Sequence, residues 1–123
     1  MTVGIDSVEI DRIAKLIGRG SFLKRFFSER ENAEFEQRNF RPQHIAAAFA
    51  AKEAFSKTIG TGLIGFDLRD VSLLHNESGK PYLSFENERL NRVSDMGLDF
   101  DVSITHTDEI ATAVVISFKG EIQ

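Results

Sequence analysis

The sequence predicts an α+β fold in which a mostly antiparallel sheet packs against a long central helix. Two observations support this fold class. Apolar residues in the first half of the chain recur at helical spacing, whereas the second half consists of short extended segments separated by turn residues. Helices followed by hairpins are typical of an α+β domain. At 123 residues, with neither internal repeats nor low-complexity segments, we expect a single domain over residues 1–123.

The chain is expected to open with a short buried strand at residues 3–6, which runs directly into a helix. That helix carries three isoleucines on one side and basic residues on another, and it should end at Gly18 and Gly20. Ser28 is followed three residues later by Glu31, a capping-box pattern that predicts a second helix of about ten residues.

The central helix is predicted from about Gln43 to Ile59, because Pro42 precedes it and Gly60 stops it. Alanine and phenylalanine dominate its middle, "AAAFAAKEAF". Such a composition indicates a helix packed closely against a core.

The second half of the chain has the period of extended structure. Residues 70–75 and 81–85 flank the turn-forming sequence Asn-Glu-Ser-Gly-Lys, so they should form a hairpin. A short helix is expected over Glu86–Met96. Residues 101–105 and 110–118 should form a second strand pair.

Composition excludes several classes of function. The net charge of −4 argues against a general nucleic-acid binder, and the absence of cysteine excludes disulfide and thiolate chemistry. No signal-peptide pattern opens the chain, and no apolar run approaches the roughly 18 residues of a membrane span. We therefore expect a cytoplasmic protein that does not bind a membrane.

Positive charge is concentrated in one early segment. Between positions 12 and 25 there are no acidic residues but five basic ones: Arg12, Lys15, Arg19, Lys24 and Arg25. In an acidic protein such a segment can present a patch to an anionic partner, or it can be an ordinary solvated helix face. Composition alone leaves both readings open.

Three charges interrupt the apolar central helix: Lys52, Glu53 and Lys57. A charge among packed alanines and phenylalanines costs free energy unless something compensates it. The simple explanation for Glu53 is an i,i+4 pair with Lys57, which stabilises a helix by only a few tenths of a kcal/mol. A divalent cation would compensate it more fully, and Mg²⁺ takes one or two carboxylates together with phosphates and waters.

Two other acidic residues could complete such a site. Asp6 follows an apolar strand, where it is either a second carboxylate ligand or, more commonly, the N-cap of the next helix. Glu9 is most simply a first-turn residue that the helix dipole favours.

The glycine-flanked turn Gly60, Thr61, Gly62 offers backbone N–H groups to an anion, although as a motif it is weak and Gly60 also suits a helix C-cap. The nearby ammonium groups of Lys52 and Lys57 favour phosphate binding there. The three histidines have no zinc-site spacing, and His106, after a strand, is more often structural or exposed than functional. No serine is paired in sequence with an activating base.

Four blocks of the sequence resemble a known family. They are "VGIDSVEIDRI" at the N-terminus, "FAAKEAFSKTIGTGL" in the middle, "NESGKPYL", and "VSITHT". In this order, and essentially from end to end, the chain is similar to the holo-[acyl-carrier-protein] synthases, the small bacterial type of 4′-phosphopantetheinyl transferase. The Lys-Glu-Ala-Phe-Ser-Lys block together with the N-terminal aspartate is the specific part.

The resemblance implies a reaction. Such enzymes move the phosphopantetheine arm of coenzyme A to a serine hydroxyl of apo-acyl carrier protein and release adenosine 3′,5′-bisphosphate. Attack on a pyrophosphate needs positioning and charge neutralisation more than a protein nucleophile. The attacking hydroxyl belongs to the partner, which would explain why no catalytic nucleophile is recognised in this sequence. Whether the carrier serves fatty-acid or polyketide synthesis stays open.

The resemblance also assigns roles. Asp6 and Glu53 would hold Mg²⁺ with the pyrophosphate of coenzyme A, and Lys57 would contact the phosphates. Other residues would lie against coenzyme A: Gly60, Thr61, Gly62, Lys80 and Pro81, with His106 and Thr107 supplied by a neighbouring subunit of a homotrimer. The base that takes the serine proton stays open between a water on the metal and one of the carboxylates.

The basic segment would then dock the acidic carrier protein. The residues expected in this contact are Arg12, Lys15, Leu16, Arg19, Lys24 and Arg25. Two positions depart from the family pattern: Ala48 stands where an arginine is usual, and Ser7 where an aliphatic residue is usual. Arg41 is one candidate to replace the missing arginine. Ala48 keeps a second function open, a non-catalytic module that binds coenzyme A or the carrier without turnover.

Overall fold

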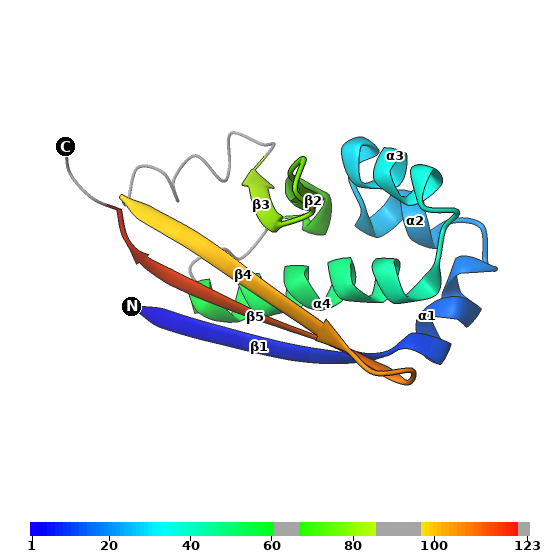
Figure 1. Cartoon of the computed structure of the whole chain (residues 1–123), viewed down its shortest axis with the longest axis horizontal. Coiled ribbons are helices and arrows are strands. Elements are labelled where there is room, and N and C mark those ends of the chain that lie inside the picture. Colours follow the sequence, from blue (N-terminus) through cyan, green and yellow to red (C-terminus); the bar gives the residue numbers. More distant parts are fainter. Residues whose placement is uncertain (61–66, 86–96, 121–123) are drawn as a thin grey trace.

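The computed structural model describes residues 1–60, 67–85 and 97–120, and its helices and antiparallel strands confirm the α+β fold (Figure 1). In chain order the elements are β1 (Thr2–Glu9), α1 (Ile10–Ile17), α2 (Phe22–Phe26), α3 (Glu29–Gln37), α4 (Pro42–Ile59), the 3-10 helix η2 (Leu68–Asp70), β2 (Val71–His75), β3 (Pro81–Phe85), β4 (Leu98–His106) and β5 (Ile110–Lys119). The helix expected over Glu86–Met96 lies outside the described residues, as do Thr61 and Gly62.

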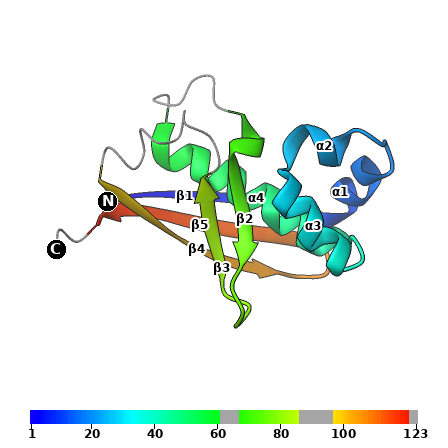
Figure 2. The same ribbon diagram turned by 90° about the horizontal axis from the view of Figure 1, so that it is seen from above.

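Two antiparallel sheets enclose α4. The larger sheet has the strand order β1-β5-β4, and the smaller one is the β2-β3 hairpin. The central helix packs on β1 and β5, while α1, β2 and β4 also contact it. Figure 1 shows α4 between the three-stranded sheet and a second layer made of α2, α3 and the hairpin, and Figure 2 shows the hairpin crossing over the helix. No described helix is long and apolar enough to span a membrane.

The alanines of α4 determine how closely the layers approach. Ala46, Ala50, Ala51 and Ala54 are fully buried, and their small side chains let backbone come near backbone. The closest approach lies at Gly4 of β1: a Cβ there would be 2.0 Å from the carbonyl oxygen of Ala54. Any larger residue at position 4 would collide with the backbone of α4, so this position requires glycine.

The first strand is longer than the sequence predicts, and it is not buried as expected, because Val3 and Ile5 on its outer face are exposed. It extends through Glu9 because every residue from Thr2 onward pairs with β5, and Glu9 lies opposite Ile110. Helix α1 consequently begins at Ile10, with Glu9 at its N-cap position and no side-chain cap. The N-cap interpretation of Asp6 is wrong, since Asp6 lies inside the strand opposite Ala113.

Most local predictions are confirmed. Ser28 and Glu31 form both hydrogen bonds of the capping box at the start of α3. Gly60 ends α4 with a φ of 64°. Both expected strand pairs are present, although β4 begins at Leu98, earlier than expected. Helix α2 was not predicted; it buries Phe22 in a cluster with other phenylalanines.

The junction between α3 and α4 makes stability depend on pH. Nη1 of Arg38 lies 3.1 Å from Nδ1 of His44, and burial lowers the pKa of His44 below its ordinary 6.5, with Arg38 lowering it further. The unfolded chain therefore binds a proton at His44 where the folded chain does not. The contribution of His44 to the free energy of unfolding is therefore fully present above about pH 6.5 and is lost as the pH falls below that value.

His44→Gln, which keeps an acceptor for Arg38, is expected to reduce the loss of unfolding free energy between about pH 7.5 and about pH 5. Urea denaturation of both proteins across this range measures the difference. An equal loss in wild type and variant would assign the acid sensitivity to other groups.

Candidate active site

Asp6 of β1 and Lys57 of α4 meet where the strand crosses the helix. Nζ of Lys57 lies 3.2 Å from Oδ1 of Asp6 and donates a hydrogen bond of 2.8 Å to the carbonyl oxygen of Ile5. The lysine side chain is half exposed, at 54%, whereas Asp6 is only 20% exposed. The ammonium group is thus anchored to β1 while part of it still faces solvent.

Glu53 lies one helical turn before Lys57 and is half-buried. Burial raises the pKa of Glu53, the negative charge of Asp6 raises it further, and Lys57 opposes both effects. The two carboxylates are therefore near enough to repel each other. The simple i,i+4 pair does not explain Glu53, because Lys57 forms its ion pair with Asp6 instead.

The donor set of this cluster suits a hard divalent cation. Two carboxylates converge from two rigid elements, and their mutual repulsion is the cost that a cation between them would remove. Within the described residues no group of three or more His, Cys, Asp or Glu side chains could hold a metal. Oxygen ligands from outside the chain would have to complete the coordination, as Mg²⁺ with substrate phosphates and waters does.

Lys52 does not belong to this cluster, and its expected contribution to phosphate binding is wrong. Its side chain is fully buried and forms an ion pair with the equally buried Glu31 of α3. It also donates to the carbonyl oxygens of Leu68 (2.7 Å) and Val71 (2.6 Å). A fully buried and hydrogen-bonded ammonium group cannot reach a ligand at the surface.

Gly60 ends the helix that carries Glu53 and Lys57, and the other described residues expected to touch coenzyme A have partners of their own. Lys80 is 3.9 Å from Asp101, and Pro81 opens β3, opposite His75. His106 and Thr107 are exposed in the β4–β5 hairpin, where Oγ1 of Thr107 accepts from the backbone N–H groups of two following residues. No described interaction joins any of these four residues to Asp6, Glu53 or Lys57.

The predicted basic face is formed by α1, by α2 and by the turn between them that carries Arg19. All five basic side chains are exposed, and Leu16 is half-buried. Its members differ in their partners. Lys15 pairs with Asp11 at 3.3 Å, and the guanidinium of Arg25 lies 5.3 Å from the ring centre of Phe26.

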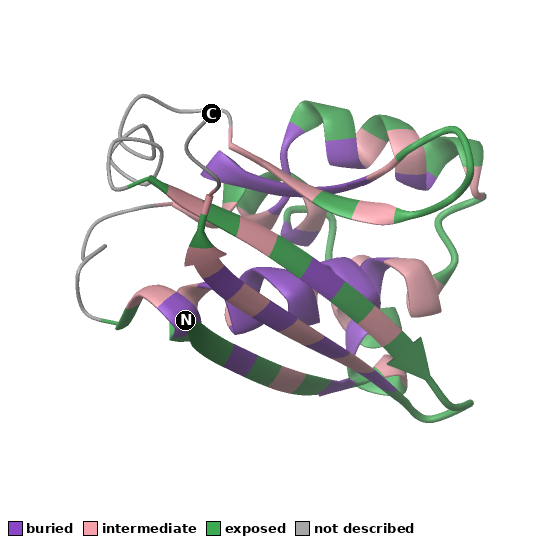
Figure 3. Cartoon of the chain, turned by 60° about the vertical axis from the view of Figure 1, so that its left-hand side comes forward, coloured by how far each residue is buried: buried purple, intermediate pink, exposed green. Residues whose placement is uncertain are grey.

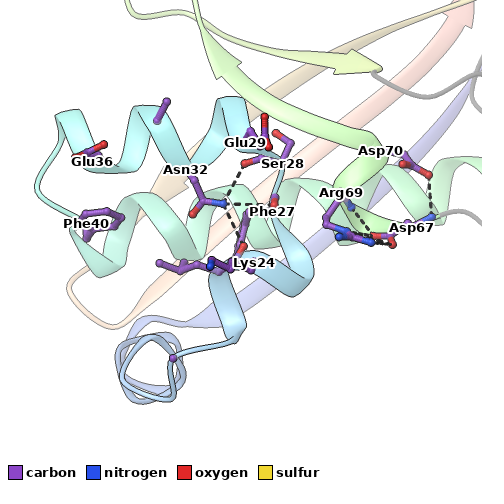
Figure 4. A pocket seen from close by; sticks show the side chains of 13 residues that line it. Lys24, Phe27, Ser28, Glu29, Asn32, Glu36, Phe40, Asp67, Arg69 and Asp70 are labelled. Atoms are coloured by element: carbon purple, nitrogen blue, oxygen red, sulfur yellow. Dashed lines mark hydrogen bonds and ion pairs between the residues drawn. The ribbon is translucent and has the colours of Figure 1, made fainter.

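Lys24 lines a hollow of about 970 Å³ between α2, α3 and η2 (Figure 4). Its walls carry more carboxylates than cations, including Glu29 and Glu36, and Arg69 is already paired with Asp67 at 2.9 Å. None of the three clustered side chains of β1 and α4 lines it. This hollow is therefore separate from the candidate site.

The two departures from the family pattern do not disturb the carboxylates. Hydroxyl groups of Ser7 and Thr112 lie 2.8 Å apart, on the sheet face opposite Asp6. Ala48 is buried in the core, 1% exposed. Gly4 is the residue that sequence reasoning missed; its place two residues before Asp6, on the same face of the strand, was the available signal.

The fold and the site together define a small α+β protein in which two carboxylates and a lysine can receive a divalent cation and an anionic group. Comparison with known proteins identifies the family. Residues 2–115 match the model of the 4′-phosphopantetheinyl transferase superfamily, and the chain belongs to that superfamily.

Two similar proteins and one similar solved structure are named holo-[acyl-carrier-protein] synthase. The chain is 38% identical over 122 residues to the holo-[acyl-carrier-protein] synthase of Caldanaerobacter subterraneus subsp. tengcongensis, covering 97% of this chain and 95% of that one. It is 40% identical over 115 residues to the enzyme of the same name from Clostridium beijerinckii, covering 93% and 94%. A crystal structure of holo-(acyl-carrier-protein) synthase from Bacillus anthracis in complex with CoA (3′,5′-ADP) is similar with a TM-score of 0.79 and 30% identity, covering 97% and 96%.

Proposed function

We propose that this protein transfers the 4′-phosphopantetheine arm of coenzyme A to a serine of apo-acyl carrier protein, as its closely similar relatives are named for doing. The observation that carries the proposal is the meeting of Asp6, Glu53 and Lys57 at the crossing of β1 and α4. These are the positions that the family resemblance assigns to the metal and the phosphates.

The reaction breaks a phosphoanhydride bond of coenzyme A and forms a phosphoester bond to the serine. The serine oxygen forms a bond to the phosphorus next to pantetheine, and the bond from that phosphorus to the bridging pyrophosphate oxygen breaks. Adenosine 3′,5′-bisphosphate leaves with the bridging oxygen. The serine proton goes to one of the carboxylates or to water. A positively charged, positioned environment is what such a transfer requires of the protein.

Asp6 and Glu53 would hold Mg²⁺, which supplies neutralisation of the pyrophosphate charge. Lys57 would contribute the second positive charge. Its ammonium is held by Asp6 and by the carbonyl of Ile5, so it is oriented before substrate arrives, and its half-exposed side chain leaves room for a phosphate oxygen. Gly60, Lys80 and Pro81 would lie along the nucleotide.

The basic face of α1 and α2 is the proposed docking surface for the carrier protein. Its guanidinium and ammonium groups are exposed, and Leu16 offers an apolar contact between Arg12 and Arg19. Acyl carrier proteins are small and acidic, so charge attraction would steer them to this face.

Arg12→Glu is expected to raise the KM for the carrier protein on the order of tenfold, because reversing a surface charge replaces attraction by repulsion worth about 1–2 kcal/mol. The KM for coenzyme A should not change. Initial rates at varied concentrations of each substrate measure both constants. Lys119→Glu is the matched control, since Lys119 is also exposed but ends β5, far from α1 (Figure 1). If only the KM for coenzyme A changed, Arg12 would contact coenzyme A and not the carrier protein.

We propose a homotrimer in which His106 and Thr107 reach the site of a neighbouring protomer. The outer face of the large sheet supports an assembly: Val3 is 64% exposed and Ile5 58%, and they lie beside Ile116 and Val114 of β5. Figure 3 shows buried residues alternating with intermediate ones along β5. Exposed apolar side chains in a row are typical of a protein interface. Light scattering coupled to size exclusion measures the assembly.

We further propose that residues 1–123 act as one transferase domain, because α4 contacts elements from both ends of the chain. The competing function is a module that binds coenzyme A or the carrier without turnover. Ala48 favours it, since the buried alanine supplies no positive charge where the family has an arginine.

Intact-mass spectrometry tests the transfer. Apo-acyl carrier protein is incubated with this protein, coenzyme A and Mg²⁺, and a parallel sample contains EDTA. The transferase predicts a mass gain of one phosphopantetheine arm that EDTA abolishes. Calorimetric binding of coenzyme A without any mass gain, using a carrier that another transferase modifies, would establish the binding module instead.

A further inference from the structure

Lys52 is the sequence neighbour of Glu53 in the candidate site, but its side chain is buried in an ion pair with Glu31. Lys52 precedes Glu53 on α4, yet its side chain points into the layer formed by α3, η2 and β2. Lysine is rarely fully buried, and an ion pair in the core often contributes little net stability compared with apolar side chains. Its presence calls for another explanation.

The ammonium group of Lys52 is held from three directions. It donates to Oε1 of Glu31 and to the carbonyl oxygens of Leu68 and Val71, and it lies 5.1 Å from the ring centre of Phe27. An ammonium group has three protons, and three acceptors are present. The side chain is therefore restricted to one position.

Glu31 is equally constrained. Its Oε1 accepts from the backbone N–H of Ser28 at 3.0 Å, and its Oε2 accepts from the backbone N–H of Leu73 at 3.0 Å. The capping glutamate of α3 thereby ties α3 and β2 to the middle of α4. Of the described buried side-chain polar atoms, none lacks a partner.

Helical geometry connects this anchor to Glu53. Successive residues of an α-helix are about 100° apart around its axis, so residues 52 and 54 point to nearly opposite sides and residue 53 points between them. Lys52 is held by the α3–β2 layer, and the carbonyl of Ala54 is in contact with Gly4 of β1. The rotation of α4 is thus constrained on both sides of Glu53.

We propose that Lys52 is a positioning residue, whose buried pair with Glu31 sets the rotation of α4 so that the Glu53 carboxylate is directed toward Asp6. The inference rests on the proposed function of the Asp6–Glu53 pair. Without the anchor, the described polar contacts of α4 with other elements lie near its two ends, at His44 and at Lys57 and Thr58. Its middle is then held by apolar packing, which tolerates small rotations. Losing a partner that orients a metal ligand weakens metal affinity or activity by about 10- to 100-fold.

The test replaces the pair in the whole protein by the uncharged combination Lys52→Met with Glu31→Gln. The glutamine can still accept a backbone hydrogen bond, and no buried charge is left without a partner. Phe35→Leu is the matched control, because Phe35 is buried on the same α3 and packs on Phe27, yet it is not among the polar partners of Lys52.

Two quantities are measured: the affinity for coenzyme A by calorimetry with and without Mg²⁺, in the absence of carrier, and the steady-state constants. The double variant is expected to lose most of the Mg²⁺-dependent gain in affinity and to lower kcat by about 10- to 100-fold at an unchanged KM for the carrier. Phe35→Leu should alter only the melting temperature. A double variant with wild-type Mg²⁺ dependence and kcat would overturn the proposal and leave the pair a purely structural one.

Lys52→Gln with Glu31→Gln provides a second comparison if the first double variant does not fold, because it also leaves no buried charge without a partner. The results that would support or overturn the proposal are the same. Measurements on the wild-type protein distinguish failure of the proposed function from failure of the positioning role of Lys52. If wild-type protein shows neither Mg²⁺-dependent binding of coenzyme A nor transfer, the proposed function fails. If it shows both and the variants equal it, only the positioning role fails.

Discussion

Glu53→Gln should abolish phosphopantetheine transfer while the protein stays folded and becomes no less stable. The loss of activity is expected because a neutral amide is a poor ligand for Mg²⁺; removing one such electrostatic group lowers kcat by about 10²- to 10³-fold. Stability should be unchanged or higher, because burial and the charge of Asp6 both raise the pKa of Glu53 and so disfavour its ionised form in the folded chain. Mass-spectrometric rates and thermal melting measure the two effects.

Asp6→Asn should have the same effect on activity but not on stability. Asp6 forms an ion pair with Lys57, so the amide variant loses a favourable contact and its melting temperature should be unchanged or lower. Glu36→Gln, at an exposed carboxylate of α3, is the control for loss of one negative charge. Full transfer by the Glu53 variant would remove Glu53 from the metal site.

Gly4→Ala is expected to destabilise the protein by about 1–3 kcal/mol or more and to lower kcat by about 10²-fold. The added Cβ would lie 2.0 Å from the carbonyl oxygen of Ala54, a backbone atom that cannot turn aside. Strand β1 must therefore move away from α4 and take Asp6 with it. Urea denaturation measures the stability, and the transfer rate measures the displacement of Asp6 from Glu53.

Gly18→Ala is the matched control for the loss of a glycine. Gly18 has a φ of −66°, and its nearest neighbour to an added Cβ would be the carbonyl oxygen of Lys15 at 3.5 Å, an ordinary contact. This variant should retain both stability and activity. If Gly4→Ala behaves like Gly18→Ala, the close approach of β1 to α4 does not control the site.

Elements whose signals are local could be predicted from the sequence. The capping box at Ser28 and Glu31, the helix α4 with its stop at Gly60, and the β2–β3 hairpin all depend on residues within a few positions of one another. Strand β1 shows the limit. Its continuation to Glu9 depends on pairing with β5, about a hundred residues away, and no local period signals that partner.

The candidate site divides in the same way. Residue type, the burial implied by neighbouring alanines, and a resemblance with specific blocks predict the site residues Asp6, Glu53 and Lys57. Lys52 lies on the same apolar helix as Lys57, and the sequence favours phosphate binding near both lysines, which the structure corrects for Lys52. The two lysines lie on different sides of α4, and only the packing of α3 and β2 reveals which one is buried.

By itself, then, the sequence determined the fold class, the central helix, the carboxylates and the family resemblance, because each is carried by short-range pattern or by residue identity. Tertiary structure alone decided that Lys57 pairs with Asp6 and Lys52 with Glu31, and that Gly4 must lack a side chain. These contacts join residues 21 to 51 positions apart. Their geometry depends on how two layers close on α4, which is a property of the packed core and not of any one segment.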